Sequence, residues 1–112
     1  MNLSHEQLFA RFRATGDPLA LGELFDRTSP QLLSLALHLC GNPADAEDAL
    51  QATFVVAIDR AKLWDSTRPL QPWLGGILTM QCRKLGERRA RRREAHLPEP
   101  ELVLDEGSPV TA

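Results

Sequence analysis

The sequence contains no tyrosine, few cysteines and no long hydrophobic run. Two cysteines, Cys40 and Cys82, are too few for a disulfide framework and lack the paired spacing of a zinc site, so we expect a reducing compartment. No apolar stretch approaches the ~20 residues that span a bilayer, and the N-terminus lacks the apolar segment of a signal peptide. We therefore expect a cytoplasmic protein with no membrane insertion.

Catalytic groupings are also lacking. The three histidines are scattered, and no Ser-His-Asp or Cys-His group is indicated. The pair Gly75-Gly76 lies within a helical stretch, not after a strand, so it does not resemble a phosphate-binding loop. His38 and Cys40 lie two residues apart, so on a helix they point in different directions and make a poor metal pair. The sequence predicts no enzyme, no cofactor and no metal site.

The composition of what remains is that of a folded soluble domain. The chain has 112 residues, of which 43% are hydrophobic and 25% charged, close to the averages for globular proteins. With few aromatic residues, the core must consist largely of Leu and Ala, which favour helices over sheets. We expect an all-α fold, a compact bundle of about four to five helices.

Caps and prolines mark the expected helices. The first begins after Ser4, which forms a capping box with Gln7. The second begins at Asp17-Pro18, with a kink or break at Ser29-Pro30 because proline cannot donate the helical hydrogen bond. The third is expected over 43–62.

A loop follows over 63–71, where turn-forming residues replace the apolar periodicity. Pro72 is then expected to open the last helix. Apolar positions continue along that helix only to Leu85, so the charged residues beyond it can be helical only as a solvated extension or when bound.

Charge is divided sharply along the chain. Residues 1–82 carry a net charge of -3, residues 83–93 carry +6, and residues 94–112 carry -5. The division suggests that only one part of the chain attracts a polyanion. We expect one helical domain over 1–96, followed over 97–112 by a flexible acidic tail or the start of an interdomain linker.

The third expected helix has two distinct sides. Five apolar residues are expected to pack in the core: Ala46, Leu50, Phe54, Ala57 and Ile58. Four residues are expected on the outward side: Glu47, Asp48, Gln51 and Val55. A mixture of acid, amide and apolar side chains is typical of a protein interface. On the residues alone, however, a solvated face is the preferred interpretation.

A basic run ends the last expected helix. Its cations occupy so many angles around the helix that they indicate general phosphate attraction, with a solubilising extension as the alternative. They are Arg83, Lys84, Arg88, Arg89, Arg91, Arg92 and Arg93. Four to six phosphate contacts would give a log-log salt slope of about -3 to -5.

The segment DAEDALQATF, at 45–54, resembles region 2.2 of sigma-70 family transcription factors. Within that family it is most similar to the extracytoplasmic-function group, which has an acidic AED, two apolar residues, Gln, an acid, Thr and Phe. The resemblance covers about residues 19–93 and continues through Trp73-Leu74 and the Arg run. Ala52 departs from the pattern, since the family commonly has Glu there.

The resemblance implies two macromolecular partners and no cofactor. One is core RNA polymerase, through the clamp coiled coil of its largest subunit, with Glu47, Asp48, Gln51 and Val55 as the contact surface. The other is the non-template strand of promoter DNA, whose minus-ten element would be recognised and melted. An anti-sigma factor is a further partner that the resemblance admits. The implied DNA contacts are Asp65, Ser66, Thr67, Arg68, Trp73, Thr79, Met80, Arg83, Lys84, Arg88, Arg89, Arg91 and Arg92.

Some features leave alternatives open. Met80 and Lys84 stand where the family usually has Asn and Asp, so a sigma-like module that binds polymerase without productive promoter opening is one alternative. A nonspecific nucleic-acid-binding domain is another. We expect Trp64 and Trp73 to be core or half-buried anchors, not stacking platforms. The family's second helix-turn-helix domain has no counterpart in these residues, which fits either an excised domain or a short protein.

Overall fold

Four α-helices and one short 3-10 helix follow one another in residues 2–96, the part of the chain that the computed structural model describes. The expected all-α bundle is confirmed, and the tail expected over 97–112 lies outside the described residues. The elements are α1 (His5–Thr15), α2 (Pro18–Cys40), α3 (Pro43–Asp59), η1 (Ala61–Leu63) and α4 (Leu70–His96).

Local caps explain where the first three helices begin. The Ser4 side chain accepts a hydrogen bond from the Gln7 backbone N–H, and the Gln7 side chain accepts one from Ser4 in return. Asp17 caps α2, and Asn42 caps α3. The helices α1 and α2 both end at a glycine with positive φ, where other residues would be strained. The sequence expectations for these boundaries are confirmed.

The helix α2 is not broken at Pro30. It remains helical from Pro18 to Cys40, with Pro30 exposed on its surface. Two hydroxyls in the turn before it, those of Thr28 and Ser29, donate to the carbonyls of Leu24 and Phe25. Thr28 and Leu32, on either side of Pro30, are buried in the core, so packing holds the helix in place despite the missing N–H.

Two other boundaries differ from expectation. The helix α3 ends at Asp59 instead of residue 62, and the chain tightens there into η1. The helix α4 begins at Leu70 instead of Pro72, because the Glu6 carboxylate on α1 accepts a hydrogen bond from the Leu70 backbone N–H at 2.8 Å. Pro72 then sits in the first turn, where its missing N–H costs nothing.

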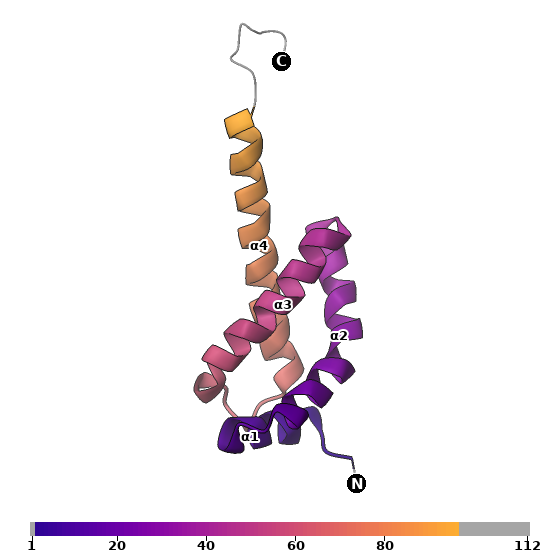
Figure 1. Ribbon diagram of the computed structural model, residues 1–112, viewed down its shortest axis with the longest axis vertical. Helices are drawn as coiled ribbons and strands as arrows, with labels where there is room; N and C mark the ends of the chain where they lie inside the picture. The colour runs from indigo at the N-terminus through magenta and orange to yellow at the C-terminus, as the bar shows by residue number, and fades with distance from the viewer. Residues whose placement is uncertain (1, 97–112) are drawn as a thin grey trace, which may run out of the picture.

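The core lies where α2, α3 and the first half of α4 pack together, with α1 across one end (Figure 1). Most of its members are Leu and Ala, as the composition indicated. The fully enclosed large side chains are Phe9, Leu24, Leu70, Leu74 and Leu78.

The second half of α4 leaves this bundle (Figure 1). Leu85 is the last residue that packs against the core, and the side chains from Gly86 to residue 95 are exposed. At 27 residues, α4 is about 40 Å long. The charged run is thus helical as a solvated extension, one of the two forms expected for it.

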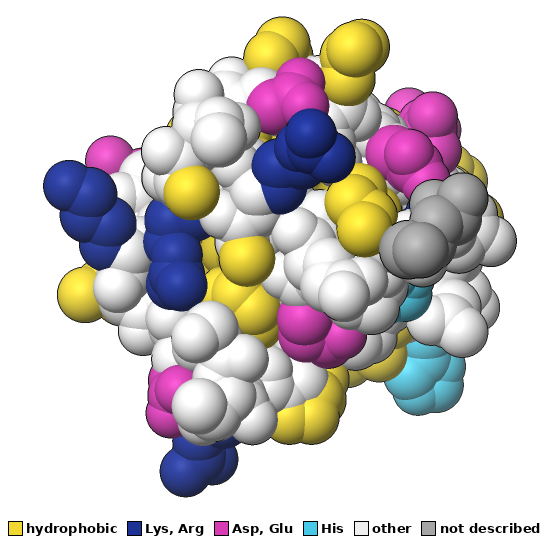
Figure 2. Space-filling view, turned by 90° about the horizontal axis from the view of Figure 1, so that it is seen from below, with side chains coloured by type: hydrophobic (Ala, Val, Ile, Leu, Met, Phe, Trp, Pro, Cys, Tyr) yellow, Lys and Arg dark blue, Asp and Glu magenta, His cyan; other side chains and the backbone are white. Residues whose placement is uncertain are grey.

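The opposite end of the molecule has a different surface. Figure 2 shows that end, which includes α1, with apolar, acidic and basic side chains interspersed. The dense group of cations at 83–93 lies far from this end, on the second half of α4.

Candidate functional site

The outward face of α3 carries the four residues expected to contact polymerase. Glu47, Asp48, Gln51 and Val55 are all exposed. At about 100° per residue, they fall within an arc of about 100° around the helix axis. Val55 is 66% exposed, so an apolar side chain lies in water beside two carboxylates and an amide. The structure therefore presents these residues as one continuous surface.

Ile58 belongs to this surface and not to the core. We expected it to be buried, but it is 43% exposed. Ile58 lies seven residues after Gln51, so the two side chains point in nearly the same direction, away from the buried side that includes Ala57. Its spacing of seven from Gln51 was the available signal. The exposed face of α3 is thus longer and more apolar than the sequence analysis predicted.

A groove between α3 and α4 borders this face. It has a volume of about 350 Å³, and its walls come from both helices. The lining residues are Asp48, Gln51, Ala52, Val55, Gln81, Leu85 and Arg88. Ala52, where the family pattern has an acid, therefore lies in a position that a longer side chain would fill.

One side of α4 gathers five of the residues expected to contact DNA. Trp73, Met80, Lys84, Arg88 and Arg91 fall within about 80° of one another around the helix axis. Four of them are exposed, and Trp73 is half-buried. This face passes from an aromatic ring to three cations along the helix, which suits bases at one end and phosphates at the other.

A hollow of about 490 Å³ lies at the aromatic end of that face, between α3 and α4. Arg60 on the α3 side and Lys84 on the α4 side give it two cations. Its remaining lining is mostly apolar: Val56, Pro72, Trp73, Gly76, Ile77, Met80 and Gln81. Arg60 was missed by the sequence analysis, because it lies in the turn after α3, far from the basic run.

Four expected DNA contacts lie elsewhere on α4: Thr79, Arg83, Arg89 and Arg92. Thr79 and Arg83 are exposed but lie roughly 80–120° away from the face that includes Trp73 and Lys84. The Thr79 hydroxyl donates to the Gly75 carbonyl at 2.9 Å. A DNA strand that follows the Trp73 face would not meet both of these side chains directly.

The loop between η1 and α4 is organised by Asp65. Its carboxylate accepts hydrogen bonds from the Thr67 backbone N–H at 3.0 Å and the Thr67 hydroxyl at 2.7 Å. The Thr67 N–H is the main cause of a lowered pKa for Asp65. Arg68 lies 3.7 Å from the same carboxylate, while Ser66 is exposed. Asp65 therefore shapes the loop, and Ser66, Thr67 and Arg68 present its outer surface.

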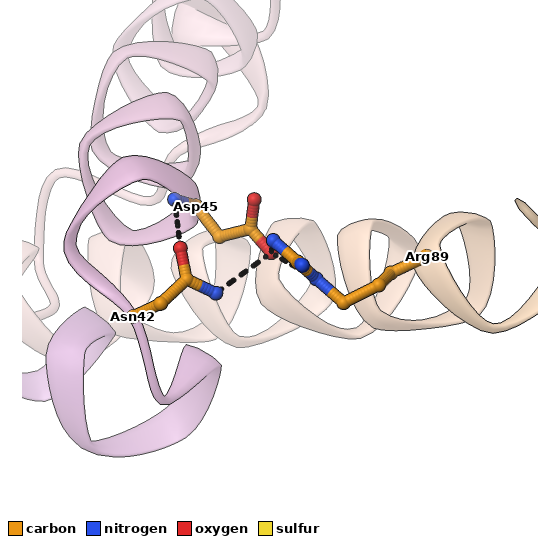
Figure 3. A network of polar contacts seen from close by, with 3 residues as sticks. All are labelled: Asn42, Asp45 and Arg89. Atoms are coloured by element: carbon orange, nitrogen blue, oxygen red, sulfur yellow. Dashed lines mark hydrogen bonds and ion pairs between the residues drawn. The ribbon is translucent and has the colours of Figure 1, made fainter. Parts of the chain in front are cut away.

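Arg89 forms an ion pair with Asp45 on α3, whereas the sequence analysis grouped it with the other cations of the run as a contact for phosphate. Its Nε and Nη2 atoms donate to Asp45 Oδ2 at 3.0 and 2.8 Å, and Asn42 Nδ2 donates to the same oxygen at 3.2 Å (Figure 3). The hydrogen bond from Arg89 is the main cause of a lowered pKa for Asp45, and the charge of Arg92 contributes. The basic run is therefore divided, because one arginine already has an anionic partner.

The two tryptophans are anchors, as expected. Trp64 is buried and packs its ring edge-on against Phe9, with ring centroids 5.4 Å apart. Trp73 lies 5.7 Å from the same Phe9 ring. Only Trp73 has an edge in the hollow between α3 and α4.

Comparisons with known proteins agree with this geometry. The family described as Sigma-70 region 2 matches residues 24–94, which include the whole of α3 and nearly all of α4. This chain belongs to the sigma-70 family. An ECF RNA polymerase sigma factor, SigE of Mycolicibacterium smegmatis, is 36% identical over 98 residues. That alignment covers 80% of this chain and 36% of SigE, so the chain spans little more than a third of that relative's length.

No solved structure gives a significant match. No helix within residues 2–96 combines the length and apolarity needed to cross a membrane. In the same described range, His, Cys, Asp and Glu side chains form no group of three that could hold a metal ion. The helix α1 precedes the segment matched by the family.

Proposed function

We propose that this chain is a transcription initiation domain that binds core RNA polymerase and engages the minus-ten element of promoter DNA. The observation that carries the proposal is the presence, on adjacent helices, of two different exposed surfaces within the matched segment. One is the acidic and apolar face of α3, and the other is the aromatic and basic face of α4. Residues 1–96 form the domain in this proposal.

The α3 face suits the clamp coiled coil of the largest polymerase subunit. Val55 and Ile58 offer apolar area to be buried, while Glu47, Asp48 and Gln51 offer acceptors and an amide at the rim. Isolated surface carboxylates do not need such apolar neighbours, so an interface explains this combination better than a solvated face.

The α4 face and the loop before it suit the non-template strand. Exposed bases can enter the hollow that includes Trp73 and Met80, and phosphates can approach Lys84 and Arg91. Opening base pairs costs a few kcal/mol, which capture of an unstacked base must offset. The loop residues 65–68 lie next to the start of α4 and complete the surface.

Capture by core polymerase tests the first half of the proposal. We expect stoichiometric capture of the 112-residue chain, lost when Asp48→Lys is combined with Gln51→Ala. The matched control is Asp26→Lys, an exposed acid on α2, which should leave capture unchanged. Unchanged capture of the double variant would refute this position of the interface.

Binding of a fluorescent promoter fork with an unpaired minus-ten strand tests the second half. We expect the complex with polymerase to prefer this fork over one with a scrambled strand, and the chain alone to bind free duplex poorly. Salt-dependent binding of any duplex by the chain alone, without polymerase, would instead favour a nonspecific nucleic-acid-binding domain.

A further inference from the structure

We propose that α1 braces the loop at 65–69 in the shape that meets promoter DNA, with Arg13 and Glu6 as positioning residues at the two ends of the loop. The inference rests on the proposed function and assigns a role to a helix that precedes the segment matched by the family. Its basis is a pair of long-range hydrogen-bonding contacts from one helix, at the entrance and at the exit of the same loop.

Arg13 holds the entrance. Its Nη1 atom donates to the Trp64 carbonyl at 2.7 Å and to the Ala61 carbonyl at 3.3 Å. Its guanidinium carbon also lies 5.3 Å from the centre of the Trp64 ring. The Ala61 carbonyl also accepts from the Trp64 backbone N–H at 3.3 Å, so Arg13 adds a second donor there. The Trp64 carbonyl lies at the end of the turn, where helical partners run out, and Arg13 donates to it from 51 residues away. The residue directly after Trp64 is Asp65, the first of the loop.

Glu6 holds the exit. Its Oε2 atom accepts a hydrogen bond at 2.8 Å from the backbone N–H of Leu70, the first residue of α4. A carboxylate at this place caps the helix and faces the positive end of its dipole. The hydrogen bond from Leu70 is the main cause of a lowered pKa for Glu6. No residue of the loop itself is needed for this cap.

The two contacts are connected by a rigid spacer. Glu6 and Arg13 are seven residues apart on α1, which places them on one face about 10 Å apart along the axis. Phe9 lies between them on that face, is fully buried, and packs against both Trp64 and Trp73. The spacing of the loop ends is therefore set by α1, and the Asp65 hydrogen bonds to Thr67 shape the middle.

Such a brace lowers the cost of binding. An exposed loop of five residues loses conformational freedom when it is ordered by a partner, and that loss reduces affinity. If both ends are already fixed, less freedom remains to be lost. We therefore expect loss of the brace to weaken recognition of the minus-ten strand more than attraction to phosphates in general.

The test compares the full 112-residue chain with Arg13→Gln and Glu6→Gln. The matched control is Arg11→Gln, an exposed arginine on the opposite side of the same helix. A second control, Leu32→Val in the core of α2, destabilises the bundle without touching the loop. Amide hydrogen exchange is measured at Thr67, and binding of the promoter fork and of a scrambled fork is measured with core polymerase.

We expect the brace variants to speed exchange at Thr67 by about 10- to 100-fold, the effect of losing one hydrogen bond to a charged group. Exchange in the centre of α2 should change no more than in the controls. The preference for the promoter fork should fall by a similar factor, with binding of the scrambled fork unchanged. Arg13→Lys should show smaller changes than Arg13→Gln, both in exchange at Thr67 and in the preference for the promoter fork. Lysine keeps the positive charge but lacks the guanidinium donors.

Unchanged loop exchange in both Gln variants would overturn the inference, whatever the DNA measurements show. Faster loop exchange with an undiminished preference for the promoter fork would also overturn it, because the loop shape would then not matter for DNA. A wild-type chain without any preference for the promoter fork would instead refute the proposed function, while loop exchange would still decide whether α1 braces the loop.

Discussion

Arg89 and Arg91 lie two residues apart on α4, yet the structure gives them different surroundings. Arg91 is exposed on the face that includes Trp73 and Lys84, whereas Arg89 is bonded to Asp45 on α3. If α4 follows a nucleic-acid strand along that face, Arg91→Gln should remove a phosphate contact. Arg89→Gln should remove much less, because its charge is already opposed by a carboxylate.

The size of the effect follows from the geometry. Lys84, Arg88 and Arg91 lie within about 60° around α4, so three cations can approach one strand together. Each phosphate contact adds about 0.7 to 0.9 to the magnitude of the log-log salt slope, so these three cations contribute about 2 to 3. This is less than the magnitude of about 3 to 5 expected from the sequence alone. We expect Arg91→Gln to reduce the slope by about 0.7 to 0.9, and Arg89→Gln by less than half as much.

Fluorescence anisotropy of a labelled promoter fork, titrated with the complex of chain and core polymerase at several KCl concentrations, gives the slope. Polymerase contributes its own phosphate contacts, so only differences from the wild-type chain are compared. Arg11→Gln, on α1, is the matched control. Asp45→Asn should make the slope steeper, because it frees Arg89. Equal losses for Arg89→Gln and Arg91→Gln would refute the division of the basic run.

Three further predictions concern stability and reactivity. Leu74→Ala should lower the free energy of unfolding by about 2–5 kcal/mol in urea denaturation, because Leu74 is fully buried; a loss under 1 kcal/mol would contradict this core. Burial raises the pKa of the Cys82 thiol to about 12, so iodoacetamide at pH 8 should modify Cys40 first and Cys82 only after unfolding, as mass spectrometry of the peptides would show. Because the pKa of Glu6 is lowered, protection of the Leu70 amide should be complete above about pH 4.5 and lost as the pH falls through that lower pKa; loss of protection already at pH 6 would count against it.

Helices with their signals nearby could be predicted from the sequence. Ser4, Asp17 and Asn42 cap the helices that follow them, and each cap depends only on residues within one turn. The start of α4 could not be predicted in this way, because its cap is the side chain of Glu6, 64 residues away in the sequence. Contacts of this kind exist only once the chain has folded.

The candidate site shows the same limit. The exposure of Asp48 and Gln51 follows from helical periodicity, which the sequence contains. The partner of Arg89 does not follow from periodicity, because Asp45 is on another helix and no nearby residue distinguishes Arg89 from the other arginines of the run. Ile58 was assigned to the wrong side because it is apolar and follows a buried alanine, although its spacing of seven from Gln51 places it on the exposed face of α3.

The place where α4 leaves the bundle also has a mechanical consequence. Gly86 directly follows Leu85, the last side chain held by the core, and glycine is among the weakest helix-forming residues. Between Gly86 and residue 95 the side chains are exposed and closely spaced guanidinium groups repel one another, while the ion pair between Arg89 and Asp45 connects this part of α4 to α3. Unwinding of α4 from its C-terminal end should therefore stop near Gly86 and leave the bundle intact. The cationic end of α4 could then bend to follow a curved polyanion.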